Sequence, residues 1–484
     1  MEWIIVVVYC TALLAIFLFS LGQLHLTWVY TRPSSKITAS FDNTYEPVVT
    51  VQLPIYNERY VAERLIDCVV QLDYPKDKLE IQILDDSTDE TINIIEGKVK
   101  HYQNLGFDIQ QVRRDDRKGF KAGALAYGTS ICKGEFTAIF DSDFLPNPDF
   151  IKRTVGYFVN EKIGMVQTRW GHVNKNYSIL TEMQAFGLDA HFTVEQGGRN
   201  RSGSFMNFNG TAGIWRKSCV LDAGGWSADT LTEDLDLSYR AQLKGWQFQF
   251  DESVESPAEL PVIMSAIKSQ QYRWNKGAAE TAKKNLFNVF RSDQSFKTKA
   301  HAAMHLLNSS VFVLLLAASI LSIPMLYIKS SNPNLEWLFN LGSLFLIGFF
   351  SIAAFYYVGL KQIVKVKTKS TFLKKFPLFL SFSMGLALHN AVAVMEGFLG
   401  FKTPFIRTPK FNITKRSESW SNNQYIKPKL TWGTLVEGML CVYFIWGIAS
   451  AWMLHDFGLI IFHIMLAIGF GIVFFHSLKH IKHA

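Results

Sequence analysis

The sequence contains few charged residues and little cysteine. Asp, Glu, Lys and Arg make up only 19% of its 484 residues, whereas 49% are hydrophobic and 14% aromatic. Since soluble proteins of this length carry more charge, this balance predicts that part of the chain lies in a membrane. The five cysteines are widely spaced, with no C-x-x-C pair and no His at metal-ligand spacing. We therefore expect neither a disulfide framework nor a zinc site.

The net charge of +8 is concentrated in the second part of the chain. From residue 301 onward there are 16 Lys or Arg and only 5 Asp or Glu. These basic residues fall in short segments between apolar runs, where they normally hold loops on the cytoplasmic side of a membrane. This pattern favours membrane orientation over polyanion binding, and we expect no nucleic-acid partner.

Long apolar runs predict one N-terminal anchor and two C-terminal helix pairs. Residues 3–24 lack charge and follow Glu2, without a small-x-small cleavage site, which favours a retained anchor in residues 1–28 over a signal peptide. Further runs at 302–328, 335–360, 432–454 and 457–478 place helix pairs in residues 301–360 and 431–484.

The run at 376–400 is expected to behave differently from the other apolar runs. It contains His389, Asn390 and Glu396, which are costly at the centre of a bilayer. It also lies within residues 361–430, which carry many basic residues. We interpret it as an interfacial or re-entrant helix in a cytoplasmic region. The prediction is a multi-pass protein of the bacterial inner membrane, with its soluble part and C-terminus in the cytoplasm.

Residues 45–260 alternate short β-rich runs with helical stretches. The runs are 48–53, 79–84, 107–112, 135–140 and 163–168. Such alternation predicts an α/β domain with a mostly parallel sheet, in which ligands bind beyond the carboxyl ends of the strands. Two of the runs end in acidic clusters, at Asp85 and Asp86 and at Asp141 and Asp143. The candidate site is therefore at this edge of the sheet.

Asp141 and Asp143 are candidate metal ligands. In extended backbone, residues two apart project to the same side, so both carboxylates can bind one Mg²⁺ or Mn²⁺ ion together with a diphosphate. A solvated turn is the alternative. Asp85 and Asp86 are candidates to accept hydrogen bonds from a nucleoside, although Asp-Ser-Thr clusters also cap helices. Lys121 lies near a predicted helix start, where it can meet phosphate oxygens, but the spacing is not that of a P-loop.

Two later motifs supply further candidates. Glu233 and Asp234 follow Thr232, a predicted N-cap, and the helix dipole would stabilise either carboxylate as an anion able to accept a proton. Asp236 is a competing candidate. Gln270, Arg273 and Trp274 share one helical face in residues 261–300, which suits a sugar platform beside a charged leaving group. An amphipathic helix lying on the membrane explains the same face equally well.

In order along the chain, these motifs resemble those of a known family. Asp86, Asp141-Ser-Asp143, Thr232-Glu-Asp234 and Gln270-x-x-Arg273-Trp274 resemble the D, D-x-D, T-E-D and Q-x-x-R-W series of membrane-embedded processive family 2 glycosyltransferases, the cellulose synthase-like group. Further segments resemble its mannan- and glucan-synthase-like branch, namely Asn57-Glu58, Lys121–Ala124, Gln167–Trp170 and Phe208–Gly210. Phe405–Lys410 is similar to the gating loop F-x-V-T-x-K, with Arg407 in place of Val.

The resemblance, which covers about residues 45–480, implies a Rossmann-like GT-A domain in the cytoplasm and an α-helical transmembrane bundle. It implies that Asp86 contacts the nucleotide and that Asp234 is the general base. It also implies that Asp141 and Asp143 hold a metal-diphosphate, and that the Gln270, Arg273 and Trp274 side chains line the acceptor and diphosphate site. The expected reaction is inverting transfer of a hexose from a UDP- or GDP-sugar to a growing β-linked polysaccharide, coupled to translocation. The alternatives are single-sugar transfer to a membrane lipid, and a non-catalytic scaffold or transporter.

Overall fold

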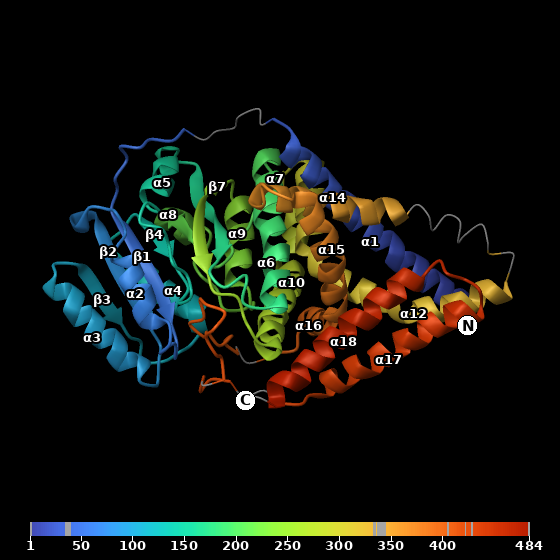
Figure 1. The fold of residues 1–484 in the computed structure, drawn as a ribbon. Coiled ribbons are helices and arrows are strands. Elements are labelled where there is room, and N and C mark those ends of the chain that lie inside the picture. The colour runs from blue at the N-terminus through green and yellow to red at the C-terminus, as the bar shows by residue number, and fades with distance from the viewer. Residues whose placement is uncertain are drawn as a thin grey trace.

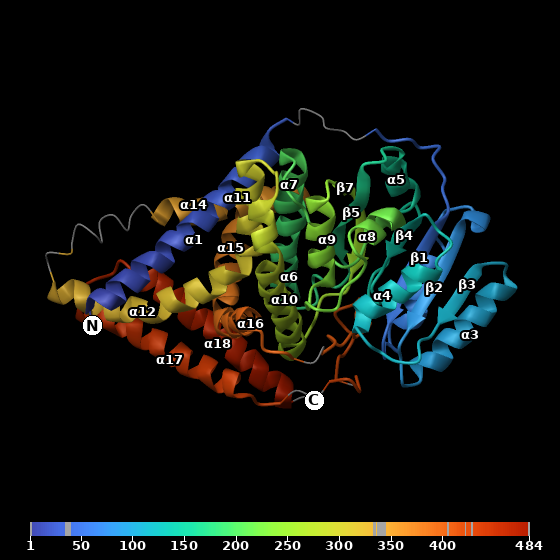
Figure 2. The same cartoon turned by 180° about the vertical axis from the view of Figure 1, so that it is seen from behind.

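The computed structural model describes residues 2–33, 40–332, 335, 345–403, 406–421, 423–426 and 429–482. An α/β domain occupies one side of the molecule, and the long apolar helices occupy the other (Figures 1 and 2). The N-terminus lies at the far end of the helical part. The C-terminus lies below the junction between the two parts.

A seven-stranded sheet with the order β3-β2-β1-β4-β6-β5-β7 forms the centre of the α/β domain. The strands are β1 Val49–Ile55, β2 Leu79–Asp85, β3 Asp108–Val112, β4 Phe136–Ile139, β5 Ile163–His172, β6 Gly213–Arg216 and β7 Gln247–Ala258. The pairs β1·β2, β1·β4, β2·β3 and β5·β7 are parallel, whereas β6 is antiparallel to both β4 and β5. The expected mostly parallel α/β fold is confirmed.

The inner strands are buried on both faces by flanking helices. Val49, Val51 and Leu53 of β1 are fully buried in the main core. The polar residues between them form hydrogen bonds across the sheet, since Thr50 Oγ1 donates to Glu80 at 2.6 Å and Gln52 Nε2 donates to Gln82 at 3.1 Å. The helical elements of this domain are α2 Ala62–Val69, η1 Lys76–Lys78, α3 Thr91–Asn104, α4 Phe120–Ile131, α5 Lys152–Val155, η2 Gly156–Val159, α6 Ile179–Ala190, the π-helical turn η3 His191–Glu195, α7 Gln196–Ser202, α8 Lys217–Asp222 and α9 Glu233–Leu243.

The remaining helices form the second part of the molecule. They are α1 Glu2–Thr31, α10 Met264–Arg291, α11 Phe296–Leu306, η4 Asn308–Ser310, α12 Val311–Ser331, α14 Phe345–Ile363, α15 Thr368–Gly385, α16 Ala387–Leu399, α17 Trp432–Met453 and α18 Ile460–Lys482. Within the described residues, five helices are long and apolar enough to cross a membrane. They are Glu2–Thr31, Asn308–Ser331, Leu346–Ile363, Trp432–Met453 and Ile460–Ile481. These overlap the five predicted spans, although residues 336–344 of the predicted run 335–360 lie outside the described residues.

The segment interpreted as interfacial or re-entrant forms two helices. α15 and α16 meet at a bend of 49° and could together form a sixth apolar span. Its place relative to the bilayer therefore stays a prediction.

The long helix α10 is one of the elements that join the two parts of the molecule. It packs against α9 of the α/β domain and against α16 of the helical part. Gly397 on α16 permits a close approach, because a Cβ there would lie 2.7 Å from the carbonyl oxygen of Lys276. Lys276 is itself fully buried and donates to the Phe401 carbonyl and to Thr403 Oγ1. The two parts are thus in direct contact along α10.

Candidate active site

The acidic clusters come together at the carboxyl ends of β2 and β4, beside two adjoining cavities of about 100 and 130 Å³. The two cavities share Lys121, Asp141, Arg273 and Lys410 in their lining. All predicted site residues except Asp85 line one or both of them, namely Asp86, Lys121, Asp141, Asp143, Glu233, Asp234, Gln270, Arg273 and Trp274. Residues separated by almost 190 positions therefore share one cleft.

The two adjacent aspartates after β2 have different surroundings. Asp85 is buried and accepts hydrogen bonds from Gln111 at 2.8 Å and from Arg113 at 2.7 Å, and it lines neither cavity. Its geometry fits a role in ordering the turn after β2 rather than the predicted ligand contact. Asp86 lines the first cavity and is held by Arg114, whose Nε lies 3.0 Å from Oδ1.

Lys121 links the two cavities. It lies in the first turn of α4, just after Gly119, which has a φ of 74°. Its Nζ lies 2.5 Å from Asp141 Oδ1 and donates to the Gly210 carbonyl at 2.8 Å. Burial opposes the charge, but the Asp141 and Glu233 carboxylates outweigh it and raise the pKa of Lys121. An ammonium is therefore fixed between the cavities, where phosphate oxygens could meet it.

Asp143 has one paired and one unpaired carboxylate oxygen. Its Oδ2 lies 2.7 Å from Lys410 Nζ, whereas Oδ1 is buried and has no hydrogen-bond partner within the described residues. The described residues contain no group of three His, Cys, Asp or Glu that could hold a metal. The Asp141 and Asp143 carboxylates fit a hard divalent cation whose remaining ligands come from phosphate oxygens and water.

Glu233 and Asp234 lie side by side in the first turn of α9. Thr232 occupies the expected N-cap position, but its hydroxyl lies 3.1 Å from that of Thr281 and does not cap the helix. Burial and, to a smaller extent, the Glu233 charge raise the pKa of Asp234 to about 7, against the opposing charge of Lys121. The helix dipole was expected to stabilise this carboxylate as an anion, but burial and the Glu233 charge have the larger effect on its pKa. A carboxyl group with this pKa is suited to accept a proton near neutral pH.

The surroundings of Asp236, the competing candidate, indicate a structural role. It is fully buried and paired with Arg240 at 2.9 Å and with Lys284 at 3.0 Å. It lines neither cavity, so the geometry favours Asp234 over Asp236.

Gln270, Arg273 and Trp274 line the second cavity from α10, as their spacing predicts. Arg273 Nη2 donates to Thr408 Oγ1 at 2.6 Å. The Trp274 ring lies 6.5 Å from that of Trp170, centroid to centroid. Trp170 packs in turn against Phe144 and Phe192. The cavity thus has an aromatic wall on which a sugar ring could stack.

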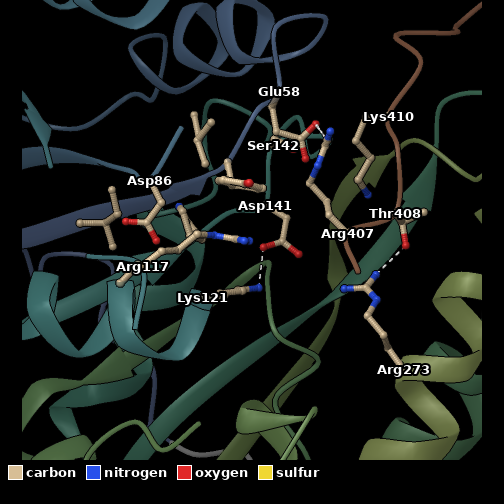
Figure 3. Close-up of a pocket in the computed structure, with 15 residues that line it drawn as sticks. Glu58, Asp86, Arg117, Lys121, Asp141, Ser142, Arg273, Arg407, Thr408 and Lys410 are labelled. Carbon is tan, nitrogen blue, oxygen red and sulfur yellow. Dashed lines mark hydrogen bonds and ion pairs between the residues drawn. The ribbon is translucent and has the colours of Figure 1, made fainter. Parts of the chain in front are cut away.

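A loop before α17 contributes Arg407, Thr408 and Lys410 to the first cavity (Figure 3), and Lys410 also lines the second. From this loop Arg407 pairs with Glu58 at 2.6 Å, and Lys410 pairs with Asp143. The backbone N–H groups of residues 411–413 donate to the Glu259 carboxylate at 2.9–3.2 Å. The loop corresponds to the gating-like motif, of which Phe405 lies outside the described residues.

Several residues at the site had no assigned role in the sequence analysis. The Arg117 guanidinium lies over the Tyr56 ring at 3.3 Å and lines the first cavity. Burial raises the pKa of Glu58 to about 7 despite the opposing charges of Arg407 and Lys410. In the sequence, Asn57-Glu58 indicated a role for Glu58 only through the family resemblance. No sequence pattern indicated a role for Arg117.

Part of the chain is similar in sequence to known proteins. Residues 47–277 match the family model described as "Glycosyltransferase like family 2". The chain is 43% identical over 251 residues to glucomannan 4-beta-mannosyltransferase 1 of Oryza sativa subsp. japonica, covering 51% of the chain and 48% of the relative. It is 43% identical over 252 residues to glucomannan 4-beta-mannosyltransferase 9 of Arabidopsis thaliana, covering 51% and 47%. The match thus spans about half the length of these curated relatives.

A solved structure supports the fold assignment. The mannosyltransferase PcManGT from Pyrobaculum calidifontis, solved with GDP-Man and Mn²⁺, is similar with a TM-score of 0.57 and 18% identity, covering 83% of this chain and all of that one. Because the curated relatives are plant enzymes, the comparisons do not support the predicted bacterial inner membrane. Residues 47–277 are therefore similar to glycosyltransferase family 2 domains, and the domain has the GT-A fold.

Proposed function

We propose that the chain transfers a mannosyl residue from GDP-mannose to a growing β-linked glycan, with inversion at the anomeric carbon. The observation that carries this proposal is the position of Asp234. A carboxyl group with a pKa of about 7 shares a cavity with the Asp143 carboxylate and an aromatic wall. The curated relatives are named glucomannan 4-beta-mannosyltransferases, which favours mannose and a polysaccharide product over the glycolipid alternative.

In this proposal the first cavity binds the nucleotide and the shared residues bind the diphosphate. Asp86, Tyr56 and Arg117 line the first cavity and supply a carboxylate, an aromatic ring and a guanidinium. Lys121 and Arg273 face both cavities and would contact phosphate oxygens. A divalent ion held by Asp141 and Asp143 would neutralise charge on the departing diphosphate. The Pyrobaculum structure, which contains GDP-Man and Mn²⁺, supports the choice of donor and metal through its shared fold.

In this proposal Asp234 removes the proton from an acceptor hydroxyl while that oxygen attacks the anomeric carbon. The bond from the anomeric carbon to the acceptor oxygen forms as the bond to the diphosphate oxygen breaks on the opposite face. Glu233 would keep the proton affinity of Asp234 high, because its charge lies beside it. Trp274 and Trp170 would hold the acceptor sugar by stacking. The product of an α-linked donor is then a β-linkage.

Placement of the domain in the cytoplasm and movement of the product through the membrane are further parts of the proposal. The five apolar helices support a membrane location, and the basic residues between them support a cytoplasmic catalytic domain. The proposed organisation keeps an anchor in residues 1–28, a catalytic domain in 45–260 and helix pairs in 301–360 and 431–484. Residues 261–300 and 361–430 connect them.

Purified full-length chain in lipid nanodiscs would test the proposal. It is incubated with Mn²⁺, a mannan oligosaccharide and either GDP-mannose or UDP-glucose, and nucleotide release is measured. We expect GDP release that depends on the acceptor, and a product that endo-β-mannanase degrades. Product formed only from UDP-glucose would contradict the donor assignment, and label recovered only in lipid would favour the glycolipid alternative.

A further inference from the structure

A histidine lies directly behind the wall of the second cavity. His191 begins the π-helical turn η3 between α6 and α7. Its Nδ1 lies 2.8 Å from Glu195 Oε2, and its Nε2 lies 3.1 Å from Asn209 Oδ1. The other oxygen of Glu195 accepts a hydrogen bond from Arg199 at 2.8 Å. Because a carboxylate can only accept, His191 must carry a proton on Nδ1.

The orientation of the Asn209 amide follows from its neighbours. Its Oδ1 lies within hydrogen-bond distance of His191 Nε2 and accepts from Asn207 Nδ2 at 2.9 Å. Its backbone N–H donates to Gln167 Oε1 at 2.9 Å, which fixes the backbone. Asn209 lines the second cavity, and its Nδ2 is buried without a hydrogen-bond partner among the described residues. A buried amide donor without a partner is costly unless a ligand satisfies it.

We propose that doubly protonated His191 is a positioning residue, which turns Asn209 so that its Nδ2 donates to a hydroxyl oxygen of a sugar in the catalytic cavity. This inference rests on the proposed glycosyl transfer. When His191 loses its Nε2 proton, the ring nitrogen becomes an acceptor facing Asn209 Oδ1, and two acceptors repel. The amide then rotates by half a turn and presents Oδ1 to the sugar instead of Nδ2.

The charges around His191 favour the doubly protonated form. Burial lowers the pKa of His191, but the Glu195 carboxylate and the Asn209 hydrogen bond outweigh burial and raise it above 6.5. Burial and nearby Arg199 hold the pKa of His305 well below its usual value, so His305 stays neutral. Charged and titratable groups on elements packed against η3 include His172 on β5, Asp189 on α6, Arg199 on α7, Tyr30 on α1 and Tyr356 on α14. The same elements also carry Arg169, Glu182, Arg201, Lys361 and His25, and His305 on α11 affects Glu195.

The direction of the pH effect follows from these charges. A group whose pKa is raised in the folded protein keeps its proton below that pKa and loses it as the pH rises. The hydrogen bond to the sugar is therefore present below the raised pKa of His191 and lost as the pH rises above it. The acid side of the activity profile belongs to Asp234, which must lose its proton to act as base. Protonation of Asp234 thus lowers kcat on the acid side of the activity profile, whereas loss of the His191 proton raises KM as the pH increases.

The test measures KM for donor and for acceptor separately, with kcat, from about pH 6 to about pH 9. The chains compared are wild type, His191→Gln and the matched control His305→Gln. His305 is a buried histidine that affects Glu195 but bonds to Tyr239, at 2.9 Å, and not to Asn209. In wild type we expect KM for one of the two sugars to rise about threefold to tenfold at alkaline pH, the loss of one hydrogen bond. The affected KM identifies the donor or the acceptor sugar.

We expect the same KM to be independent of pH in His191→Gln and to keep the wild-type rise in His305→Gln. An equal alkaline rise in wild type and His191→Gln, or none in wild type, would overturn the inference. Asn209→Asp provides a second variant if His191→Gln does not fold. It removes the donor, so its KM should be high at every pH, and a wild-type KM would overturn the inference. Wild-type chain that releases no GDP overturns the proposed function and this inference together.

Discussion

Two pairs of acidic residues in the same cleft have opposite electrostatic surroundings. Asp141 and Asp143 each face an ammonium group, from Lys121 at 2.5 Å and Lys410 at 2.7 Å. Glu233 and Asp234 instead lie beside each other, and burial together with the neighbouring carboxylate raises the pKa of Asp234 to about 7. The comparison shows that the surroundings, not the residue type, separate carboxylates suited to a metal-diphosphate from a carboxylate suited to proton transfer.

The strongest test of this comparison removes the proposed base. Asp234→Asn keeps the size of the side chain but cannot accept a proton. We expect kcat to fall by about 10²- to 10⁴-fold, whereas donor binding is kept. Nucleotide release and calorimetric binding of GDP-mannose measure the two effects. Asp229→Asn is the control, because Asp229 is an exposed carboxylate five residues earlier. Unchanged turnover in Asp234→Asn would remove it as the base.

A second test removes one member of the other pair. Asp143→Asn should weaken Mn²⁺-dependent donor binding by about tenfold to hundredfold, because a proposed ligand is lost. Titration of the variant with GDP-mannose, with and without Mn²⁺, measures this effect. If the two acidic pairs had the same role, Asp234→Asn would weaken the binding of GDP-mannose by a similar factor.

The pH dependence distinguishes the two pairs further. Since the pKa of Asp234 is raised to about 7, activity should fall as the pH drops through 7 and the carboxylate takes up a proton. Glu233→Gln removes a neighbouring negative charge, so the acid limb should move to lower pH. The kcat profile measures this shift. An acid limb that stays in place would mean that Glu233 does not set the proton affinity of Asp234.

Glu58 combines features of both pairs. It is buried like Asp234, and it faces a cation, as Asp141 and Asp143 do. Arg407→Met removes that cation and leaves the carboxyl group buried. We expect a loss of stability below the roughly 3–5 kcal/mol typical of a broken buried pair, since a group with a pKa of about 7 is readily neutralised by a proton. Thermal unfolding measures the loss. A decrease beyond that range would show that Glu58 stays charged.

The sequence predicted five of the seven strands and most of the site, for physical reasons. Strands β1, β2, β4 and β5 are largely buried, and acidic clusters mark the ends of β2 and β4, whereas β3 is shorter and more polar. β6 has only two apolar side chains, between Gly213 and Arg216, and polar residues recur along β7, so neither gives such a signal.

Features that depend on side-chain direction or on distant contacts could not be predicted. Neighbouring residues in extended backbone point in opposite directions, which is why Asp86 lines a cavity and Asp85 does not. The pairing of Lys410 with Asp143 joins positions far apart in sequence. The raised pKa of Asp234 depends on burial, which no short motif records.

The uninterrupted length of α10 has a mechanical consequence. This helix of 28 residues carries Arg273 and Trp274 in the catalytic cleft and, within one turn of them, the buried Lys276. Gly397 lets α16 touch the helix backbone at Lys276, and Tyr272 also contacts Glu396 on α16. A tilt of α16 would therefore move the part of α10 that carries Arg273 and Trp274. In the proposed membrane location, strain in the lipid would therefore reach the catalytic cleft through the backbone of α10 itself.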